Sequence, residues 1–245
     1  GAKLEFIFDN TRPLGLNLMA GTRYKIWAEA YQEFNVGESD FFVFGLDYRK
    51  YIKIHRNLIW ANRFSYSTSV GNRKLVYFMD AVDDWLVFGG DQFDFDQNID
   101  RTQGYYFQTI ATPMRGFIQN VRNGNSFALF NSELRWPIFS YFSQKPIKSD
   151  FIKNFQVIGF TDIGSAWTGP NPYSEENSFN TRVVTSGGAS TIVRLENKKD
   201  PVVGSYGFGL RSKLLGYFVR FDYAWGVEDG IIQDPIYHFS LALDF

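Results

Sequence analysis

The last nine residues of the chain alternate between two kinds of side chain. Apolar residues occupy one set of positions and small or polar residues the other: Tyr237, Phe239, Leu241, Leu243 and Phe245 against His238, Ser240, Ala242 and Asp244. Successive side chains of a β-strand point to opposite faces, so this stretch predicts a strand with one apolar face. An apolar face that ends on an aromatic residue is typical of the closing strand of a bacterial outer-membrane barrel. The alternative is the last strand of a soluble β-sandwich.

The composition favours membrane strands over membrane helices. Aromatic residues make up 19% of the 245 residues, with 26 Phe and 14 Tyr, and the mean hydropathy is −0.23. The sequence has no run of about 18 apolar residues, which argues against a helical membrane span. A polar average is expected of a transmembrane barrel, because half of each strand faces a wet or filled lumen. The net charge of −1 gives no reason to expect a nucleic-acid partner.

Eight further stretches show the same alternation. They are Leu4–Asp9, Thr22–Phe34, Phe42–Lys53, Asn57–Val70, Ser126–Ile138, Phe151–Trp167, Gly204–Lys213 and Tyr217–Trp225. Stretches of about ten residues have the length that a tilted strand needs to cross a bilayer. The sequence therefore predicts an all-β chain that forms about nine strands of a transmembrane antiparallel β-barrel. Because single-chain bacterial barrels have an even number of strands, the odd count suggests that further strands belong to the barrel.

Two long segments interrupt the alternation. Residues 72–123, which we name the inserted segment, are irregular and rich in Asp, Gly and aromatic residues. An ordinary loop without secondary structure stays below about 12–15 residues, so this segment is expected to carry function or to fill space. The second, Gly169–Pro201, is polar and is predicted to be an exposed extracellular loop. The chain starts at Gly1 directly before a predicted strand and without a secretion signal, so we expect a mature or truncated piece.

Several stretches match the motifs of one family in the family's order. They are Met114–Phe117 with its Arg-Gly-Phe triplet, Asn131–Ile138, Phe160–Gly164 with its aromatic-x-Asp-x-Gly pattern, and the hairpin pieces Gly207–Arg211 and Val219–Asp222. In these stretches the chain resembles the BamA/TamA-type outer-membrane assembly barrels of the bacterial surface-antigen superfamily. The C-terminal third most resembles Bacteroidetes members, some of which carry TolB-like periplasmic repeats. Residues 1–71 match the family only loosely.

The resemblance implies a sixteen-stranded barrel in the bacterial outer membrane, with a long loop inserted in its lumen. The predicted strands would form its C-terminal part, from about the eighth strand onward. Such a barrel inserts or assembles outer-membrane proteins through a seam that opens, without bond chemistry or a cofactor. The implied partners are outer-membrane lipids, client outer-membrane or secreted proteins, and periplasmic or lipoprotein partners. Two alternatives stay open, namely a two-partner-type secretion or lipid-transport pore, and a barrel subunit of a larger envelope complex.

Alternation also predicts which charged side chains face the lumen. In the strand that follows the inserted segment, Glu133 and Arg135 lie on the face opposite the apolar residues. In the next strand Asp162 points inward by the same count, and Gly164 completes the motif around it. Two carboxylates are therefore expected inside the barrel, on neighbouring strands.

The Arg-Gly-Phe triplet would supply the cation that these carboxylates need. Breaking a desolvated ion pair costs about 3–5 kcal/mol, and the guanidinium fork suits bidentate carboxylate contacts. We predict that Arg115 bonds to Asp162 and Glu133 and locks the inserted segment inside the barrel. Gly116 would allow a tight turn, and Phe117 would fill a lumenal pocket. The alternative is a surface arginine and two unrelated lumenal carboxylates.

Three other kinds of site fit the sequence less well. The inserted segment carries four aspartates close together: Asp91, Asp94, Asp96 and Asp100. Their spacing differs from a calcium-binding hand loop, so we interpret them as solvated loop carboxylates. The two histidines, His55 and His238, lie on different predicted strands in a chain without cysteine, which argues against a zinc site. Ser165 has no sequence-visible base with an orienting group, which argues against an outer-membrane lipase.

Overall fold

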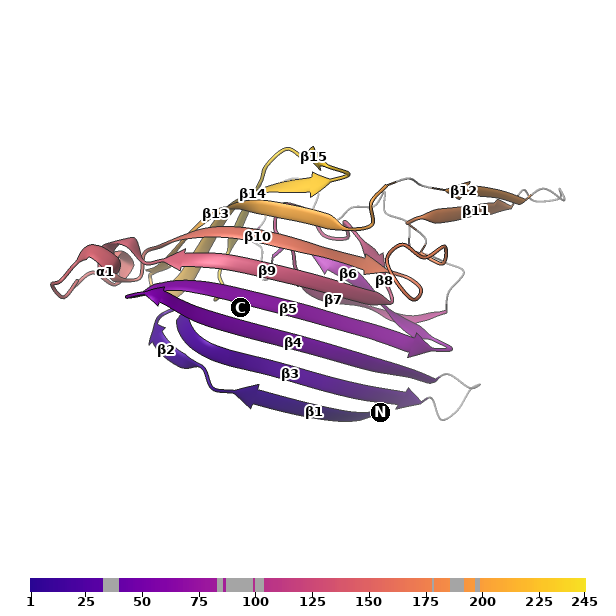
Figure 1. Cartoon of the computed structure of the whole chain (residues 1–245), viewed down its shortest axis with the longest axis horizontal. Helices are drawn as coiled ribbons and strands as arrows, with labels where there is room; N and C mark the ends of the chain where they lie inside the picture. The colour runs from indigo at the N-terminus through magenta and orange to yellow at the C-terminus, as the bar shows by residue number, and fades with distance from the viewer. Residues whose placement is uncertain are drawn as a thin grey trace.

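A computed structural model describes residues 1–32, 40–82, 86, 99, 104–177, 179–185, 192–196 and 199–245. One eleven-stranded sheet dominates it (Figure 1). The body of the sheet consists of β1 (Ala2–Asp9), β3 (Leu18–Gln32), β4 (Asp40–His55), β5 (Leu58–Gly71), β9 (Ser126–Trp136), β10 (Gln156–Trp167), β13 (Val203–Leu214), β14 (Tyr217–Glu228) and β16 (Ile236–Ser240). Two short strands, β2 (Arg12–Gly15) and β15 (Ile231–Ile232), pair with β3 and β14.

Every predicted alternating stretch contributes a strand to this sheet. The strands of the body follow one another in the order β1-β3-β4-β5-β9-β10-β13-β14-β16, and each neighbouring pair is antiparallel. The all-β class is therefore confirmed. Among the described strands β1 pairs only with β3 and β16 only with β14, so no described strand joins the two edges of the sheet. The Leu86 N–H donates to the main-chain oxygen of Phe239 on β16 at 2.7 Å.

The exposed outer face of the sheet is apolar, whereas the inner face buries polar and charged side chains together with apolar core residues. The large apolar side chains of the outer face are between 38% and 77% exposed and occur on every strand of the body; we name them the apolar belt: Leu4, Phe6, Phe8, Ile26, Phe42, Phe44, Tyr48, Ile52, Trp60, Phe64, Val70, Phe130, Leu134, Ile163, Tyr206, Phe208, Leu210, Tyr217 and Tyr237. Alternate positions bury serine, aspartate, glutamate and arginine instead. A soluble sheet places these two kinds of side chain the other way round.

The inserted segment contains more regular structure than its sequence indicates. It forms a three-stranded sheet of β6 (Lys74–Asp80), β7 (Tyr105–Pro113) and β8 (Asn123–Gly124), which lies behind the main sheet in Figure 1. The expectation of an irregular stretch over 72–123 is wrong for these strands. Residues 75–79 are all buried, so β6 is covered on both faces and shows no alternation in its sequence.

Apolar packing and serine hydroxyls hold this small sheet against the inner face of the main sheet. Leu75, Tyr77 and Met79 pack in one core cluster with residues of β4, β9, β10 and β13. The row of serines on β5 supplies the polar contacts. The hydroxyls of Ser67 and Tyr77 lie 2.9 Å apart, and the Leu75 N–H donates to Ser69 Oγ at 3.0 Å.

The connections at the two ends of the strands differ in length. At one end, two-residue turns join β4 to β5 and β13 to β14, and two short helices, α1 (Ile138–Phe142) and α2 (Asp150–Lys153), join β9 to β10. At the other end lie the inserted segment and a hairpin of β11 (Thr181–Thr185) and β12 (Ile192–Glu196), as Figure 1 shows. In the part of the chain that the structure describes, no helix is long and apolar enough to cross a bilayer.

Three sequence-based expectations need correction at these ends. The predicted strand over 151–167 begins as α2, because the Ser149 side chain caps a helical turn there, and β10 starts at Gln156. The polar stretch over 169–201, predicted as a plain loop, contains the β11–β12 hairpin. β9 ends at Trp136, two residues earlier than expected, since Pro137 has no N–H for the ladder.

Candidate functional site

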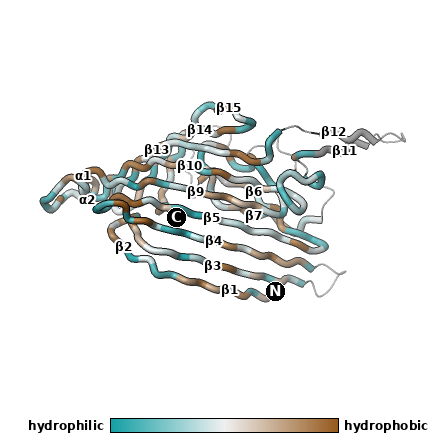
Figure 2. The backbone as a smooth tube through the Cα atoms, viewed as in Figure 1, coloured by the Kyte–Doolittle hydropathy of each residue, from teal (hydrophilic) through white to brown (hydrophobic). Residues whose placement is uncertain are grey.

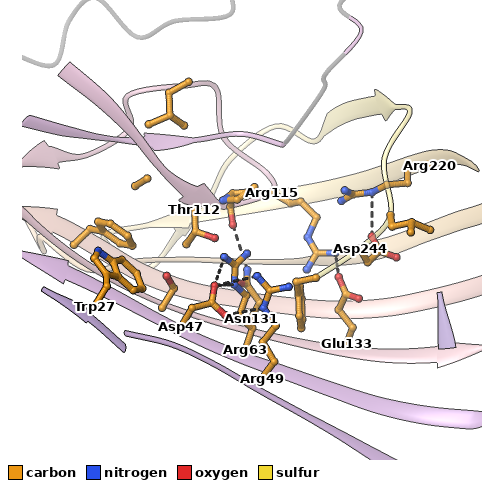
Figure 3. A pocket seen from close by; sticks show the side chains of 17 residues that line it. Trp27, Asp47, Arg49, Arg63, Thr112, Arg115, Asn131, Glu133, Arg220 and Asp244 are labelled. Carbon is orange, nitrogen blue, oxygen red and sulfur yellow. Dashed lines mark hydrogen bonds and ion pairs between the residues drawn. The ribbon is translucent and has the colours of Figure 1, made fainter. Parts of the chain in front are cut away.

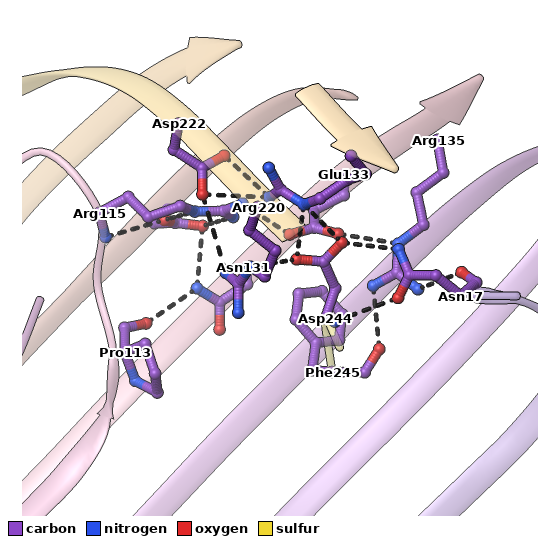
Figure 4. A network of polar contacts seen from close by, with 12 residues as sticks. Asn17, Pro113, Arg115, Asn131, Glu133, Arg135, Arg220, Asp222, Asp244 and Phe245 are labelled. Atoms are coloured by element: carbon purple, nitrogen blue, oxygen red, sulfur yellow. Dashed lines mark hydrogen bonds and ion pairs between the residues drawn. The ribbon is translucent and has the colours of Figure 1, made fainter. Parts of the chain in front are cut away.

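Arg115 is the centre of a buried ionic network on the inner face (Figure 4). Its Nε and Nη2 donate to the Asp162 carboxylate at 2.8 and 2.7 Å, and its Nη1 donates to Glu133 Oε1 at 2.6 Å. The guanidinium carbon lies 3.7 Å from the centroid of the Phe160 ring. All three charged side chains are at most 4% exposed. The residues that the sequence analysis expects to meet thus lie together in the structure.

The turn after β7 places Arg115 at this point. Gly116 has φ +85, a left-handed conformation that side-chain-bearing residues rarely adopt. A Cβ at Gly116 would lie 2.9 Å from the main-chain nitrogen of Gly226, so the turn presses directly on β14. The Gly116 N–H donates to Nε2 of His238 at 3.1 Å. Phe117 is buried beside Gly226, which leaves room for its ring, as expected of a pocket-filling side chain.

Both carboxylates that bind Arg115 have a further partner. Asn131 Nδ2 donates to Asp162 Oδ1 at 2.8 Å, and Arg135 Nε donates to Glu133 Oε2 at 2.8 Å. Asn131 and Asp162 are directly opposite each other in the β9–β10 register. The β9–β10 pairing therefore places the two acceptors of Arg115 on neighbouring strands.

The residues that follow β16 turn inward and extend the network. The fully buried carboxylate of Asp244 accepts from Arg211 Nε at 3.0 Å and forms an ion pair with Arg220 Nε at 3.0 Å. Arg211 Nη2 also donates to Asp222 Oδ1 at 2.8 Å. Residues 241–245, which we name the tail, are thus bound to β13 and β14 on the inner face of the sheet.

Asn17, in the turn between β2 and β3, joins the tail to the early part of the chain. Its Nδ2 donates to Asp244 Oδ2 at 2.7 Å, and its Oδ1 accepts from the Asp244 N–H at 3.1 Å. Its main-chain oxygen accepts from Arg135 Nη1 at 3.0 Å. Asn17 has φ +62, a conformation that asparagine tolerates better than most residues. The tail therefore bridges segments from both ends of the sequence.

This inward path corrects the predicted closing strand over 237–245. β16 ends at Ser240. Of the predicted lipid-facing residues, three keep an exposed or partly exposed position: Tyr237, Phe239 and Leu241. Leu243 is exposed as well, but it lines a cavity on the inner face. Phe245 lies inside instead, packed against a cluster that includes Tyr51, with its main-chain oxygen 2.9 Å from Arg135 Nη2. The charge-assisted contacts of Asp244 stabilise this path over an extended strand end.

The buried charges of the network balance. Four guanidinium groups face four carboxylates: Arg115, Arg135, Arg211 and Arg220, and Glu133, Asp162, Asp222 and Asp244. Burial acts to lower the pKa of the Arg115 guanidinium, but the charges of Asp162 and Glu133 raise this pKa well above its ordinary value. The network ties the inserted segment, four strands and the tail together.

A cavity of about 430 Å³ lies between this network and the inner faces of β3, β4 and β5 (Figure 3). Trp27 lines its wall, and Asp47 accepts from Arg49 Nε and Arg63 Nη2, each at 2.6 Å. Arg115 and Glu133 line the opposite side. The cavity is thus lined by charged side chains, and the acidic and basic groups on its walls pair with one another.

The remaining residues that the sequence analysis considers make packing contacts and hydrogen bonds within the fold. A Cβ at Gly164 would lie 2.5 Å from Leu129 Cδ1, so this glycine makes room for a side chain of β9. Ser165 Oγ donates to the main-chain oxygen of Pro201 at 2.8 Å. His55 Nδ1 lies 2.8 Å from Tyr141 Oη, far from the partners of the other histidine.

No cluster of three or more His, Cys, Asp or Glu suited to a metal ion occurs among the described residues. The four aspartates weighed for calcium, at positions 91, 94, 96 and 100, fall outside the described residues.

The sequence analysis missed several members of the network. They are Asn17, Asn131, Arg211, Arg220, Asp222, His238 and Asp244, whose hydrogen bonds and ion pairs within the network were not predicted. Alternation does place Arg211, Arg220 and Asp222 on the inner faces of β13 and β14. It gives no sign of which inward residues meet, and none of the inward turn after β16.

The comparisons with known proteins leave the family open. No family model matches the chain, and no curated protein matches it.

We expect Arg115→Ala to lower the free energy of unfolding by about 3–5 kcal/mol, because it leaves two buried carboxylates without their cation. Urea unfolding measures this loss, and limited proteolysis of the inserted segment should become faster. Arg49→Ala is the matched control, since Asp47 keeps Arg63 and the Arg49 side chain is 25% exposed. The Arg49→Ala control should lower the free energy of unfolding by less than about 1 kcal/mol. Equal losses in the two variants would contradict a central role for Arg115.

A second pair of variants separates backbone strain from close packing at the turn. Gly116 and Gly216 have φ +85 and +91, but a Cβ at Gly216 meets nothing within 4 Å. Gly216→Ala should cost about 1–2 kcal/mol for the left-handed conformation alone. Gly116→Ala should cost about 1–3 kcal/mol more, because the new methyl group collides with β14. Denaturant unfolding of both variants compares them; the same loss in both would show that the turn does not press on β14.

Proposed function

We propose that this chain forms part of the wall of a transmembrane β-barrel in the bacterial outer membrane. The observation that carries the proposal is the apolar belt, which covers the outer face of every strand in the sheet body while the inner face buries a balanced ionic network. Monomeric soluble proteins rarely expose contiguous apolar patches beyond a few hundred Å². Lipid-facing and lumen-facing residues alternate in this way along the strands of membrane barrels.

The two open edges of the sheet support a larger barrel. A bilayer offers no water to satisfy free N–H and C=O groups, so a sheet in lipid has to close on itself. Within the described residues β1 and β16 each pair with a strand on one side only, and the Leu86 N–H donates to the main-chain oxygen of Phe239 on β16 at 2.7 Å. Further strands would therefore complete the wall between them, in agreement with the sixteen-stranded barrel that the resemblance implies.

We infer that the barrel inserts or assembles other outer-membrane proteins at the edge beside β16. This strand pairs over five residues, whereas β13 and β14 pair over eleven. A short edge strand makes a weak seam, and a client strand could add to the exposed edge by β-augmentation. The process needs no bond chemistry and no cofactor. Clients would be outer-membrane or secreted proteins, with periplasmic or lipoprotein partners assisting.

Two other functions would use the same wall differently. A secretion or lipid-transport pore needs an open lumen, but the inserted segment is held on the inner face by Arg115 and by apolar packing. Its release would have to precede transport. A barrel subunit of a larger envelope complex would use the wall as a scaffold. We favour insertion of clients over an open pore, because buried ion pairs hold the segment on the inner face.

Membrane insertion is tested by placing arginine at two depths. Ile163 is 49% exposed in the middle of β10, whereas Leu215 is 91% exposed in the β13–β14 turn. Ile163→Arg should cost about 2–4 kcal/mol of folding free energy in lipid vesicles, and Leu215→Arg about 0–1 kcal/mol. Urea titration of the vesicle-bound chain gives both values. If Ile163→Arg is tolerated as well as Leu215→Arg, the belt does not face lipid.

The assembly function is tested by depletion of the protein from its own cells. We expect the amounts of many unrelated outer-membrane β-barrel proteins to fall together, as quantified by mass spectrometry of outer-membrane fractions. Vesicles that contain the intact protein should also speed the folding of an added, urea-unfolded barrel client relative to empty vesicles. If the barrel profile stays intact while one secreted protein disappears, the secretion alternative holds instead.

A further inference from the structure

The connection between β9 and β10, residues 137–155, exposes apolar side chains beyond the end of the sheet; we name it the connector. Neither α1 nor α2 buries a residue. Four large apolar side chains of the connector are 40% to 63% exposed: Phe139, Phe142, Phe151 and Ile152. Figure 2 shows hydrophobic and hydrophilic residues side by side along these two helices. Exposure on this scale in so short a segment calls for a covering partner.

The connector is a fixed structure. Tyr141 is held from two sides, because its hydroxyl lies 2.8 Å from His55 Nδ1 and its main-chain oxygen accepts from Arg56 Nη1 at 2.9 Å. Ser212 Oγ donates to the main-chain oxygen of Phe151 at 2.7 Å, which fixes α2 to β13. These contacts come from β13 and the β4–β5 turn and hold the exposed rings in place.

The connector packs on the outer side of the sheet. Trp136 and Phe155 stand at outward positions of β9 and just before β10, in step with Leu134 and Val157. The Trp136 ring contacts the rings of α1 residues at 5.8 and 5.9 Å between centroids, and Phe155 contacts Phe139 at 5.4 Å. The exposed rings therefore continue the apolar belt.

Positive charge surrounds these rings. The connector carries three exposed lysines and one aspartate: Lys145, Lys148, Lys153 and Asp150. Asp150 is itself paired with Lys213 of β13 at 3.2 Å. The connector thus has a net charge of +2, from three lysines less one aspartate, in a chain whose net charge is −1.

We propose that the connector docks on anionic phospholipid headgroups at the membrane boundary on the short-turn side of the sheet. The inference rests on the proposed function, since it needs the apolar belt to lie in a bilayer. Interfacial segments combine aromatic residues at headgroup level with lysines that reach the phosphates. The connector supplies both, on the lipid side of the wall. Its continuity with the belt and its lysines favour lipid over a protein partner.

The absence of cysteine from the chain allows a site-specific test with the intact protein in vesicles. Single substitutions Phe142→Cys, Ile163→Cys and Tyr173→Cys would each carry a bimane fluorophore. The vesicles contain phosphatidylcholine and phosphatidylglycerol in equal parts, with a nitroxide either near the top or near the end of the acyl chain. Tyr173 is 64% exposed at the opposite end of the strands and serves as the control outside the bilayer.

Bimane at position 142 should be quenched by the upper nitroxide about twofold more than bimane at position 173. Bimane at position 163 should respond most to the deep nitroxide. If position 163 is quenched and position 142 is not, the connector proposal fails and the membrane barrel stands. If position 163 is not quenched either, the proposed function itself fails. Quenching at position 142 that appears only after removal of a co-purified protein would assign the connector to a protein partner.

The role of charge is tested with labelled lipids of two kinds. Nitroxide-bearing phosphatidylglycerol should quench bimane at position 142 about twofold more than equally labelled phosphatidylcholine, because the lysines enrich the anionic lipid. The triple variant Lys145→Gln, Lys148→Gln, Lys153→Gln should remove this preference and leave the quenching at position 163 unchanged. If the triple variant keeps the preference for phosphatidylglycerol, the three lysines do not select the anionic lipid.

Discussion

The structure depends on charge neutralisation in its buried interior. A buried guanidinium or carboxylate without its partner costs several kcal/mol, which is a large part of the stability of an ordinary domain. The inner face carries four of each, from β9, β10, β13, β14, the inserted segment and the tail. Apart from the Arg135–Glu133 pair of β9 and the looser Arg220–Asp222 pair of β14, these ion pairs join different segments of the chain. Arg115 takes its two carboxylates from β9 and β10, and Asp244 takes its two arginines from β13 and β14. The network thus makes each element a condition for the burial of the others.

The exposed outer face is the complement of this arrangement. Because the charged side chains occupy alternate positions and point inward, the apolar residues between them point outward. In water such a sheet would expose a continuous apolar surface, which drives association or aggregation. In a bilayer the same pattern is stable, since lipid covers the apolar belt and the ionic network never meets it. The pairing of stacked aromatics across strands, such as Phe8 with Tyr24 at 5.1 Å, adds rigidity to the outer face without requiring burial by protein.

The alternation of side chains with a period of two residues decides how much of this structure can be predicted from the sequence. It records the face on which a side chain lies, so the strands and the inward positions of Glu133, Arg135 and Asp162 follow directly. A strand that is buried on both faces shows no alternation, so the sequence does not predict β6. The path of the chain beyond a strand end leaves none either. The inward turn of the tail depends on Arg211 and Arg220, which lie over twenty residues away, and on Asn17 from the first turn. Only the three-dimensional arrangement brings these groups together.

The tail and the inserted segment meet in the same network, and this has a consequence for the proposed insertion function. The Gly116 N–H binds His238 on β16, while Arg135 binds both Glu133, the partner of Arg115, and the main-chain oxygen of Phe245. Any movement that frees the edge at β16 would therefore act on contacts that also hold the inserted segment. For an inserter this coupling is useful, because the seam would open only against a defined resistance set by buried ion pairs. It would also reclose when the carboxylate of Asp244 returned to its two arginines. The same contacts that neutralise the interior would thus set how readily the wall opens to a client strand.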